Sequence, residues 1–271
     1  MHGLRQTGCP THGPGVILPC MDAVRPPAVA GSFYPADPIE LRETVSRLLA
    51  AARPGPVPKA VIAPHAAYVY SGPVAASAFR RVVDAPFTRV VLLGPSHFVH
   101  VRGLALPDAA AMSTPLGNVP VEDLPLPRNG RAHQREHSLE VELPFLQVAL
   151  RLETVAPLAV GEAVPEEVAG VIDQNWGGKE TLLVVSSDLS HYLPYEDAKT
   201  MDAATAKEIM ALGRITHEDA CGADPINGLL RAAKQRGMRS ELIDLRNSGD
   251  TAGDKRRVVG YGAFAFYEKS A

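Results

Sequence analysis

The chain has 271 residues, 46% of them hydrophobic, which is enough for one large α/β domain or two small ones with a substantial core. A formal net charge of −3 excludes the basic surface of a nucleic-acid-binding protein and a polybasic membrane stripe. No apolar run approaches the roughly 20 residues that span a bilayer. The three cysteines have no disulfide-framework spacing, so we expect a globular protein of the reducing cytoplasm.

The first part of the chain lacks any helix or strand periodicity. Residues 1–22 are rich in Gly, Pro and Cys, and Cys9, His12 and Cys20 could be drawn as a small metal knuckle. No second ligand pair follows at zinc-finger spacing, which favours a disordered leader or a mis-assigned start. We expect a single α/β domain over residues 23–271.

The rest of the chain alternates between strand and helix patterns. Short blocks rich in Val, Ile and Leu predict buried strands at residues 59–63, 89–93, 154–161, 181–186, 239–245 and 258–267. Apolar residues at helical spacing predict helices after Asp37 and at residues 72–84, 137–152, 165–176, 195–212 and 221–237. Short antiparallel strands are expected within residues 103–122. This alternation favours one three-layer αβα domain with a largely parallel central sheet.

Two predicted helices carry terminal signals. Asp37 followed by Pro38 is typical of an N-cap and a first helical residue. In the last helix, Asp224 is a candidate N-cap before Pro225, and Gly237 suits the residue just after the helix ends.

Three of the apolar runs end on a histidine. The segments read KAVIAPH, RVVLLGPSH and TLLVVSSDLSH, and their last residues are His65, His97 and His191. In an open parallel sheet the carboxyl ends of the strands point to one edge, where ligands bind. Three histidines that follow three such strands can therefore meet at one point, and this pattern indicates a metal site.

An aspartate accompanies the third histidine. Asp188 precedes His191 by three residues, so one turn of helix would put the carboxylate and the imidazole on the same side. Such a pair can be a ligand and its orienting partner, or an acid and a base. Asp188 can equally be a helix cap below a hydrogen-bonded histidine.

Cys221 lies just before the Asp224 cap, near the positive end of a helix dipole. That position favours the thiolate, the form that binds metals or attacks electrophiles. The alternative is a small buried thiol.

A further polar group stands at the start of the helix predicted over residues 137–152. His137 and Glu140 are spaced to share a face and are candidate supporting residues of the site, whereas Glu142 is expected to be solvated. The remaining histidines of this part of the chain have no supporting pattern and are expected at the surface: His100, His133 and His217.

Seven segments in order resemble the Memo family, whose prokaryotic members are known as AmmeMemoRadiSam system protein B. They are AGSFYP, APHAAYVYSGPVAASAF, LLGPSHF, TPLG, EHSLEVELPFLQ, VVSSDLSHY and CGADPINGLL. The matches cover almost everything from about residue 25 to the C-terminus. The family shares its fold with the class III extradiol dioxygenases, so the resemblance implies an extradiol-dioxygenase-like fold.

The resemblance also implies roles for individual residues. His65, His97 and Cys221 fall on the Memo metal-ligand positions, and Asp188 and His191 fall on supporting or catalytic positions of the same pocket. The resemblance thus selects Cys221, where spacing alone favoured three histidines. Two imidazoles and a thiolate leave coordination positions open and suit iron or copper, and also zinc. The glutamate ligand of the true dioxygenases has no assignable counterpart.

Three functions remain open from the sequence. The first is a redox-capable iron or copper protein that activates oxygen, with His191 as proton donor or acceptor and Asp188 as its orienting partner. The second is a binding protein whose pocket recognises a peptide or a partner. The third is a metal-free hydrolase with Cys221 as nucleophile, a histidine base and Glu140 as helper. The family's system name implies radical-SAM and Ammecr-type partner proteins, and the ligand is an unknown small molecule or peptide.

Overall fold

A computed structural model describes residues 23–269, so the expectations for Cys9, His12 and Cys20 lie outside the described residues. The main element is an eight-stranded sheet with the order β10-β11-β2-β8-β3-β7-β4, in which β9 pairs with β11 as a short branch. Its strands are β2 (Ala60–Ala63), β3 (Arg89–Pro95), β4 (Leu104–Ala105), β7 (Thr154–Val160), β8 (Thr181–Ser186), β9 (His191–Leu193), β10 (Arg239–Asn247) and β11 (Val258–Tyr267).

The centre of this sheet is parallel. Strands β2, β8, β3 and β7 run in the same direction, while β11, β10 and β4 add antiparallel strands at the two sides. Every residue of β2 and β8 is buried, which explains their uninterrupted apolar sequence. The predicted, largely parallel central sheet is confirmed.

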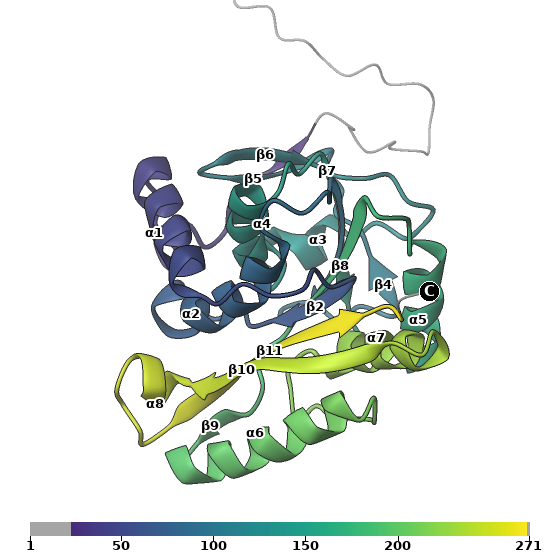
Figure 1. The fold of residues 1–271 in the computed structure, drawn as a ribbon. Coiled ribbons are helices and arrows are strands. Elements are labelled where there is room, and N and C mark those ends of the chain that lie inside the picture. The colour runs from purple at the N-terminus through teal and green to yellow at the C-terminus, as the bar shows by residue number, and fades with distance from the viewer. Residues whose placement is uncertain (1–22, 270–271) are drawn as a thin grey trace, which may run out of the picture.

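Helices cover both faces of the sheet, as Figure 1 shows. They are α1 (Pro38–Ala51), α2 (Tyr68–Phe79), α3 (Gly130–Gln134), α4 (Leu143–Ala149), α5 (Pro165–Gln174), α6 (Tyr195–Met210), α7 (Ala223–Gln235) and α8 (Ser248–Thr251), with 3-10 turns η1 (Arg80–Val82) and η2 (Glu140–Glu142). Within residues 23–269, none of the helices is both long enough and apolar enough to cross a bilayer.

Two hydrophobic clusters lie on opposite sides of the sheet. Val90 packs in the cluster that contains α1, α2 and α4, whereas its neighbour Val91 packs in the cluster that contains α5, α6 and α7. Successive residues of a strand point to opposite faces, so one apolar run contributes to both clusters. The three-layer α/β architecture predicted from the sequence is confirmed. A small second sheet, β1-β5-β6, adds β1 (Val24–Arg25), β5 (Ala111–Thr114) and β6 (Gly117–Pro120).

Most element boundaries agree with the sequence to within two residues. The helix predicted over residues 72–84 begins earlier, at Tyr68, and continues through α2 and η1 to Val82. Two further differences have identifiable reasons. The helix predicted over residues 137–152 is only η2 and α4, because the backbone N–H groups of His137 and Ser138 donate to the Glu136 carboxylate. The N-cap of α7 is Gly222, where the backbone N–H donates to Ser187 Oγ, and Asp224 lies inside the first turn.

The other predicted helix ends are confirmed. Asp37 accepts hydrogen bonds from the backbone N–H groups of Ile39 and Glu40, with Pro38 as the first residue of α1. Gly237 follows α7 with a φ of 60°, the left-handed conformation that glycine adopts most easily.

Candidate metal centre

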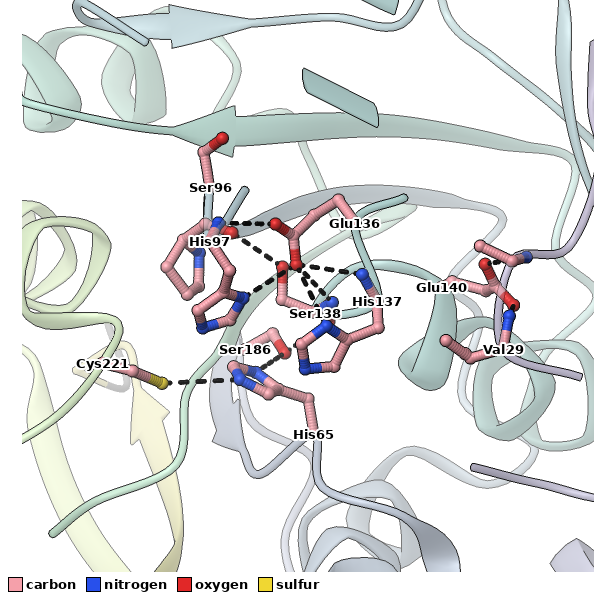
Figure 2. A network of polar contacts seen from close by, with 12 residues as sticks. Val29, His65, Ser96, His97, Glu136, His137, Ser138, Glu140, Ser186 and Cys221 are labelled. Carbon is pink, nitrogen blue, oxygen red and sulfur yellow. Dashed lines mark hydrogen bonds and ion pairs between the residues drawn. The ribbon is translucent and has the colours of Figure 1, made fainter. Parts of the chain in front are cut away.

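Three imidazoles meet at the carboxyl edge of the parallel strands. His65 follows β2 and His97 follows β3, the two strands that flank β8 in the sheet, and His137 lies in the loop before η2. One ligand nitrogen from each ring lies within 4.8 Å of those of the other two. The ring centroids are 5.3 Å apart for His65 and His97 and 4.8 Å apart for His97 and His137. Figure 2 shows the three rings facing one another.

The third imidazole of this group is His137, which the sequence placed only among the supporting residues. Its loop is held against β3 because Ser138 Oγ donates to the Pro95 carbonyl at 2.9 Å. Glu136, the residue before His137, accepts the backbone N–H of His97 at 2.6 Å. Two long-range contacts therefore bring a residue 40 positions away in the sequence next to His97.

Glu136 orients His97, a role that was not predicted from the sequence. One carboxylate oxygen lies 2.9 Å from Nδ1 of His97. Burial favours the neutral acid, but hydrogen bonds from the His97 ring and the local backbone override it and lower the pKa of Glu136 to about 2. An ionised carboxylate can only accept, so Nδ1 of His97 carries a proton and Nε2 is left free to bind a metal. An acidic residue directly before His137 was the only sequence signal.

His65 is anchored through its other ring nitrogen. Nδ1 lies 2.8 Å from Oγ of Ser186, the last residue of β8, and Nε2 faces Cys221 (Figure 2). Burial, followed by the charges of His97 and His137, lowers the pKa of His65 well below its usual range. Burial also lowers the pKa of His137. Both rings are therefore held neutral, the form that coordinates metals.

Cys221 lies next to the imidazole group. Its Sγ is 3.4 Å from Nε2 of His65, and it precedes α7 as the sequence indicated. The expected thiolate is wrong for the metal-free site, because burial and then the charge of Asp188 raise the pKa of Cys221 to about 12. The thiol is therefore the favoured form in the metal-free site, and a bound cation would favour the thiolate. Its role as a ligand stays a prediction.

Asp188 and His191 do not share a helical turn, which corrects that expectation. The segment between β8 and β9 is tied to β11 instead, because the Leu189 N–H donates to the Gly260 carbonyl at 2.8 Å. Asp188 accepts the backbone N–H of His65 at 2.9 Å, and burial raises its pKa to about 7. Asp188 and His191 nevertheless line the same cavity as the three imidazoles.

Three other polar residues lie where the sequence did not place them. Glu140 is bonded to Arg25 and to the Tyr34 hydroxyl, and among the described residues it makes no hydrogen bond to His137. Glu142 and His133, expected in solvent, are 0% and 1% exposed. Glu142 is the last residue of η2, and its Oε1 lies 2.9 Å from Ser186 Oγ. Nε2 of His133 lies 2.8 Å from the carbonyl oxygen of Ala105 in β4.

Comparison with known proteins supports the resemblance noted above. The family model described as Memo-like protein matches residues 25–265. The chain belongs to the Memo family. MEMO1 family proteins of Sulfolobus acidocaldarius, Methanopyrus kandleri and Aquifex aeolicus are 33%, 35% and 36% identical to it. The alignments cover 88–89% of this chain and 97–98% of the relatives. This Memo chain is thus similar to its relatives along nearly their whole length.

The Memo site opens into a cavity of about 760 Å³. The aromatic side chains of Phe33, Tyr70, Tyr192 and Tyr261 line its walls, together with Arg257. Tyr192 has a φ of 60°, an uncommon backbone conformation for a bulky residue and one that is found preferentially at binding sites. A cavity of this size and lining suits a small organic molecule or a peptide side chain.

The residues of this Memo chain fit a metal ion. Three imidazoles converge, and the Nδ1 atoms of His65 and His97 already have partners in Ser186 and Glu136. Nitrogen ligands next to the thiol of Cys221 suit iron, copper or zinc. The adjoining cavity leaves room for further ligands on the metal. A metal ion can therefore bind where these rings meet.

Proposed function

We propose that this Memo-family protein is a redox-capable metalloenzyme that binds iron or copper. The observation that supports the proposal is the grouping of His65, His97 and His137 at the wall of an open cavity. His65 and His97 are common to this group and to the ligand set implied by family resemblance. His137 and Cys221 are the two candidates to complete it.

The chain's own residues supply the remaining parts of such a site. A bound iron or copper ion would provide one-electron chemistry with oxygen or a reduced oxygen species. Asp188, with a pKa of about 7, can exchange a proton with a ligand in the cavity near neutral pH, and His191 lines the same wall. Glu136 keeps Nε2 of His97 available, and aromatic side chains line the cavity beside it.

Metal analysis tests this function directly. Protein purified anaerobically without added metal should contain stoichiometric iron or copper, and a His65→Ala, His97→Ala double variant should not. His100→Ala is the matched control, because the His100 side chain is 72% exposed. Equal metal content, spectra and oxygen consumption in the wild-type protein and the double variant would contradict the proposal.

A second candidate is a binding protein that uses the same pocket. Four of the exposed large apolar side chains lie at this pocket or next to it. Tyr70 and Tyr192 line the cavity, Phe98 adjoins His97, and Val69 is next to Tyr70 in the chain. Exposed aromatic groups of this kind favour a peptide or protein partner. Radical-SAM and Ammecr-type proteins are the partner classes we propose.

Purified partner proteins distinguish the two functions. Binding that is unchanged by a chelator and by Cys221→Ala, but is lost in Tyr192→Ser, would favour the adaptor. Binding that needs the metal would favour the enzyme. The metal-free hydrolase has less support, because burial raises the pKa of the Cys221 thiol to about 12 and keeps the nucleophile protonated. The free thiol of Cys221 also fits a reducing, cytoplasmic setting for either function.

A further inference from the structure

A buried carboxyl group and a buried hydroxyl lie behind His65. Glu142 is the last residue of η2 and Ser186 the last residue of β8, and both are 0% exposed. Oγ of Ser186 is 2.6 Å from the Ser138 carbonyl oxygen, 2.8 Å from Nδ1 of His65 and 2.9 Å from Oε1 of Glu142. One hydroxyl thus has three polar neighbours.

The hydrogens of this group can be assigned by counting donors and acceptors. A serine hydroxyl has one proton to donate and two lone pairs to accept with. The Ser138 carbonyl can only accept, and its contact is the shortest of the three, so the Ser186 proton points to it. The other two contacts must then donate to Ser186. Nδ1 of His65 supplies one proton, and the carboxyl group of Glu142 must supply the other.

The surroundings of Glu142 agree with a neutral acid. Its second oxygen, Oε2, is buried and has no hydrogen-bond partner among the described residues. An ionised carboxylate in that position would leave a full charge desolvated and unpaired. The other two carboxylates of the segment differ, because Glu136 accepts from His97 and Glu140 pairs with Arg25. Burial also raises the pKa of Glu142 well above its usual range.

We propose that Glu142 is a protonated carboxylic acid in the native protein and a positioning residue for His65. Its O–H donates to Ser186, Ser186 donates to the Ser138 carbonyl, and Nδ1–H of His65 donates to Ser186. This chain of donors fixes the histidine tautomer whose Nε2 lone pair faces the imidazole group and Cys221. The inference deepens the proposed function, on which the metal-binding role of His65 rests.

The proposal makes two neighbouring ligands chemically unequal. His97 is backed by an ionised carboxylate, which increases its basicity as a ligand, whereas His65 is backed by a neutral hydroxyl and a neutral acid. The site therefore gains one fixed negative charge behind its imidazoles, and not two.

Infrared spectroscopy of the metal-free protein tests the protonation state. Above the pKa of Asp188, which is about 7, we expect the carbonyl stretch of one protonated carboxyl group. The band should disappear in Glu142→Gln and remain in Glu140→Gln, a matched control two residues away whose carboxylate is equally buried but paired with Arg25. In the wild-type protein, nitrogen-15 NMR should show His65 protonated at Nδ1. Absence of the band, or a proton on Nε2, would overturn the proposal without the need for any variant.

Zn²⁺ affinity tests the positioning role. The amide of Gln can donate to Ser186 as the protonated acid does, so Glu142→Gln should bind Zn²⁺ with an affinity within about threefold of the wild-type protein. Glu142→Leu cannot donate and should bind Zn²⁺ roughly tenfold more weakly, as is usual when a residue that supports a ligand is lost. A Gln variant as weak as Leu, or a Leu variant as tight as wild type, would contradict the role. If no variant and no wild-type sample binds metal, the proposed function fails, and the spectra of the metal-free protein still decide the state of Glu142.

Discussion

The two anchored imidazoles show how single residues define the candidate centre. Nδ1 of His97 is 2.9 Å from an ionised carboxylate, and Nδ1 of His65 is 2.8 Å from a hydroxyl. In each case the anchored nitrogen leaves Nε2 as the free ligand atom. The site therefore depends on side chains that do not themselves reach the metal.

Glu136→Gln should weaken metal binding by roughly 10–100-fold, because an amide oxygen is a poorer acceptor for Nδ1–H of His97 and does not raise its basicity. Isothermal titration with Zn²⁺ measures the change. Glu196→Gln is the control, since that side chain is 79% exposed on α6. An unchanged affinity in Glu136→Gln would show that His97 is not a ligand.

The third ligand can be identified by comparing two single variants. If the three imidazoles are the metal ligands, His137→Ala should lower the affinity for metal more than tenfold. Losses of about 10–100-fold are typical even for residues that only support a ligand. Cys221→Ala should then keep most of the affinity and remove any sulfur-to-metal charge-transfer band from the copper-loaded spectrum. The reverse result would favour the ligand set implied by the family resemblance.

The buried histidine of α3 makes stability depend on pH. Burial lowers the pKa of His133 from 6.5 to about 4, and its Nδ1 has no hydrogen-bond partner within residues 23–269. Between these values the unfolded chain binds more protons, so the stabilising contribution is complete above pH 6.5 and is lost as the pH falls towards 4. The loss is about 3 kcal/mol.

Urea unfolding between these pH values measures this contribution. His133→Gln should flatten the dependence of the unfolding free energy on pH, since the amide can still donate to the Ala105 carbonyl but does not titrate. His217→Gln, at a side chain that is 70% exposed, should leave the slope as it is. Equal slopes in the wild-type protein and His133→Gln would contradict the assignment.

At the scale of elements, the close approach of β3 to the loop that carries His137 depends on a glycine. A Cβ at Gly94 would lie 2.8 Å from Ser138 Oγ and 3.1 Å from Leu139 Cδ2. Gly94→Ala should therefore cost about 1–3 kcal/mol by overpacking and displace the neighbouring His137. Thermal unfolding and Zn²⁺ titration check both effects. Gly170→Ala in α5, where a Cβ meets nothing within 4 Å, should instead stabilise by about 0.5–1 kcal/mol.

The strands and helices could be predicted because their signals are local. The Val- and Leu-rich runs of β3 and β8 and the cap of α1 are visible within a few residues of sequence. The loop between α3 and α4 could not be predicted in this way, because its contacts are long-range. Glu136 bonds to His97, 39 residues away, and Glu140 bonds to Arg25, 115 residues away. Local periodicity carries no information about such pairs, and for this reason the sequence placed Glu142 in solvent and His137 outside the ligand group.

At the scale of the whole molecule, the candidate ligands come from segments that are far apart in the chain. His65 and His97 follow two different strands, and His137 belongs to a loop, so one ion would tie three parts of the fold together. A ligand that binds only the folded state stabilises it by about 4 kcal/mol at a thousandfold excess over its Kd.

Removal of the metal should therefore lower the Tm by several degrees in a chain of this length. Differential scanning calorimetry with and without a chelator measures the shift, and excess Zn²⁺ should reverse it. The His65→Ala, His97→Ala double variant should show no shift. A chelator effect of the same size in that variant would mean that the stabilising ion binds elsewhere.

The hydrogen bonds of Arg25 connect the N-terminal strand to this centre. From β1, the guanidinium donates to the carbonyl groups of His133 and Glu136 and pairs with the buried carboxylate of Glu140. A chain that lacks β1 would leave the Glu140 carboxylate buried without its cation, and the backbone segment that carries His137 would lose two hydrogen bonds. Trimming one end of the polypeptide would thus loosen a ligand more than a hundred positions along it.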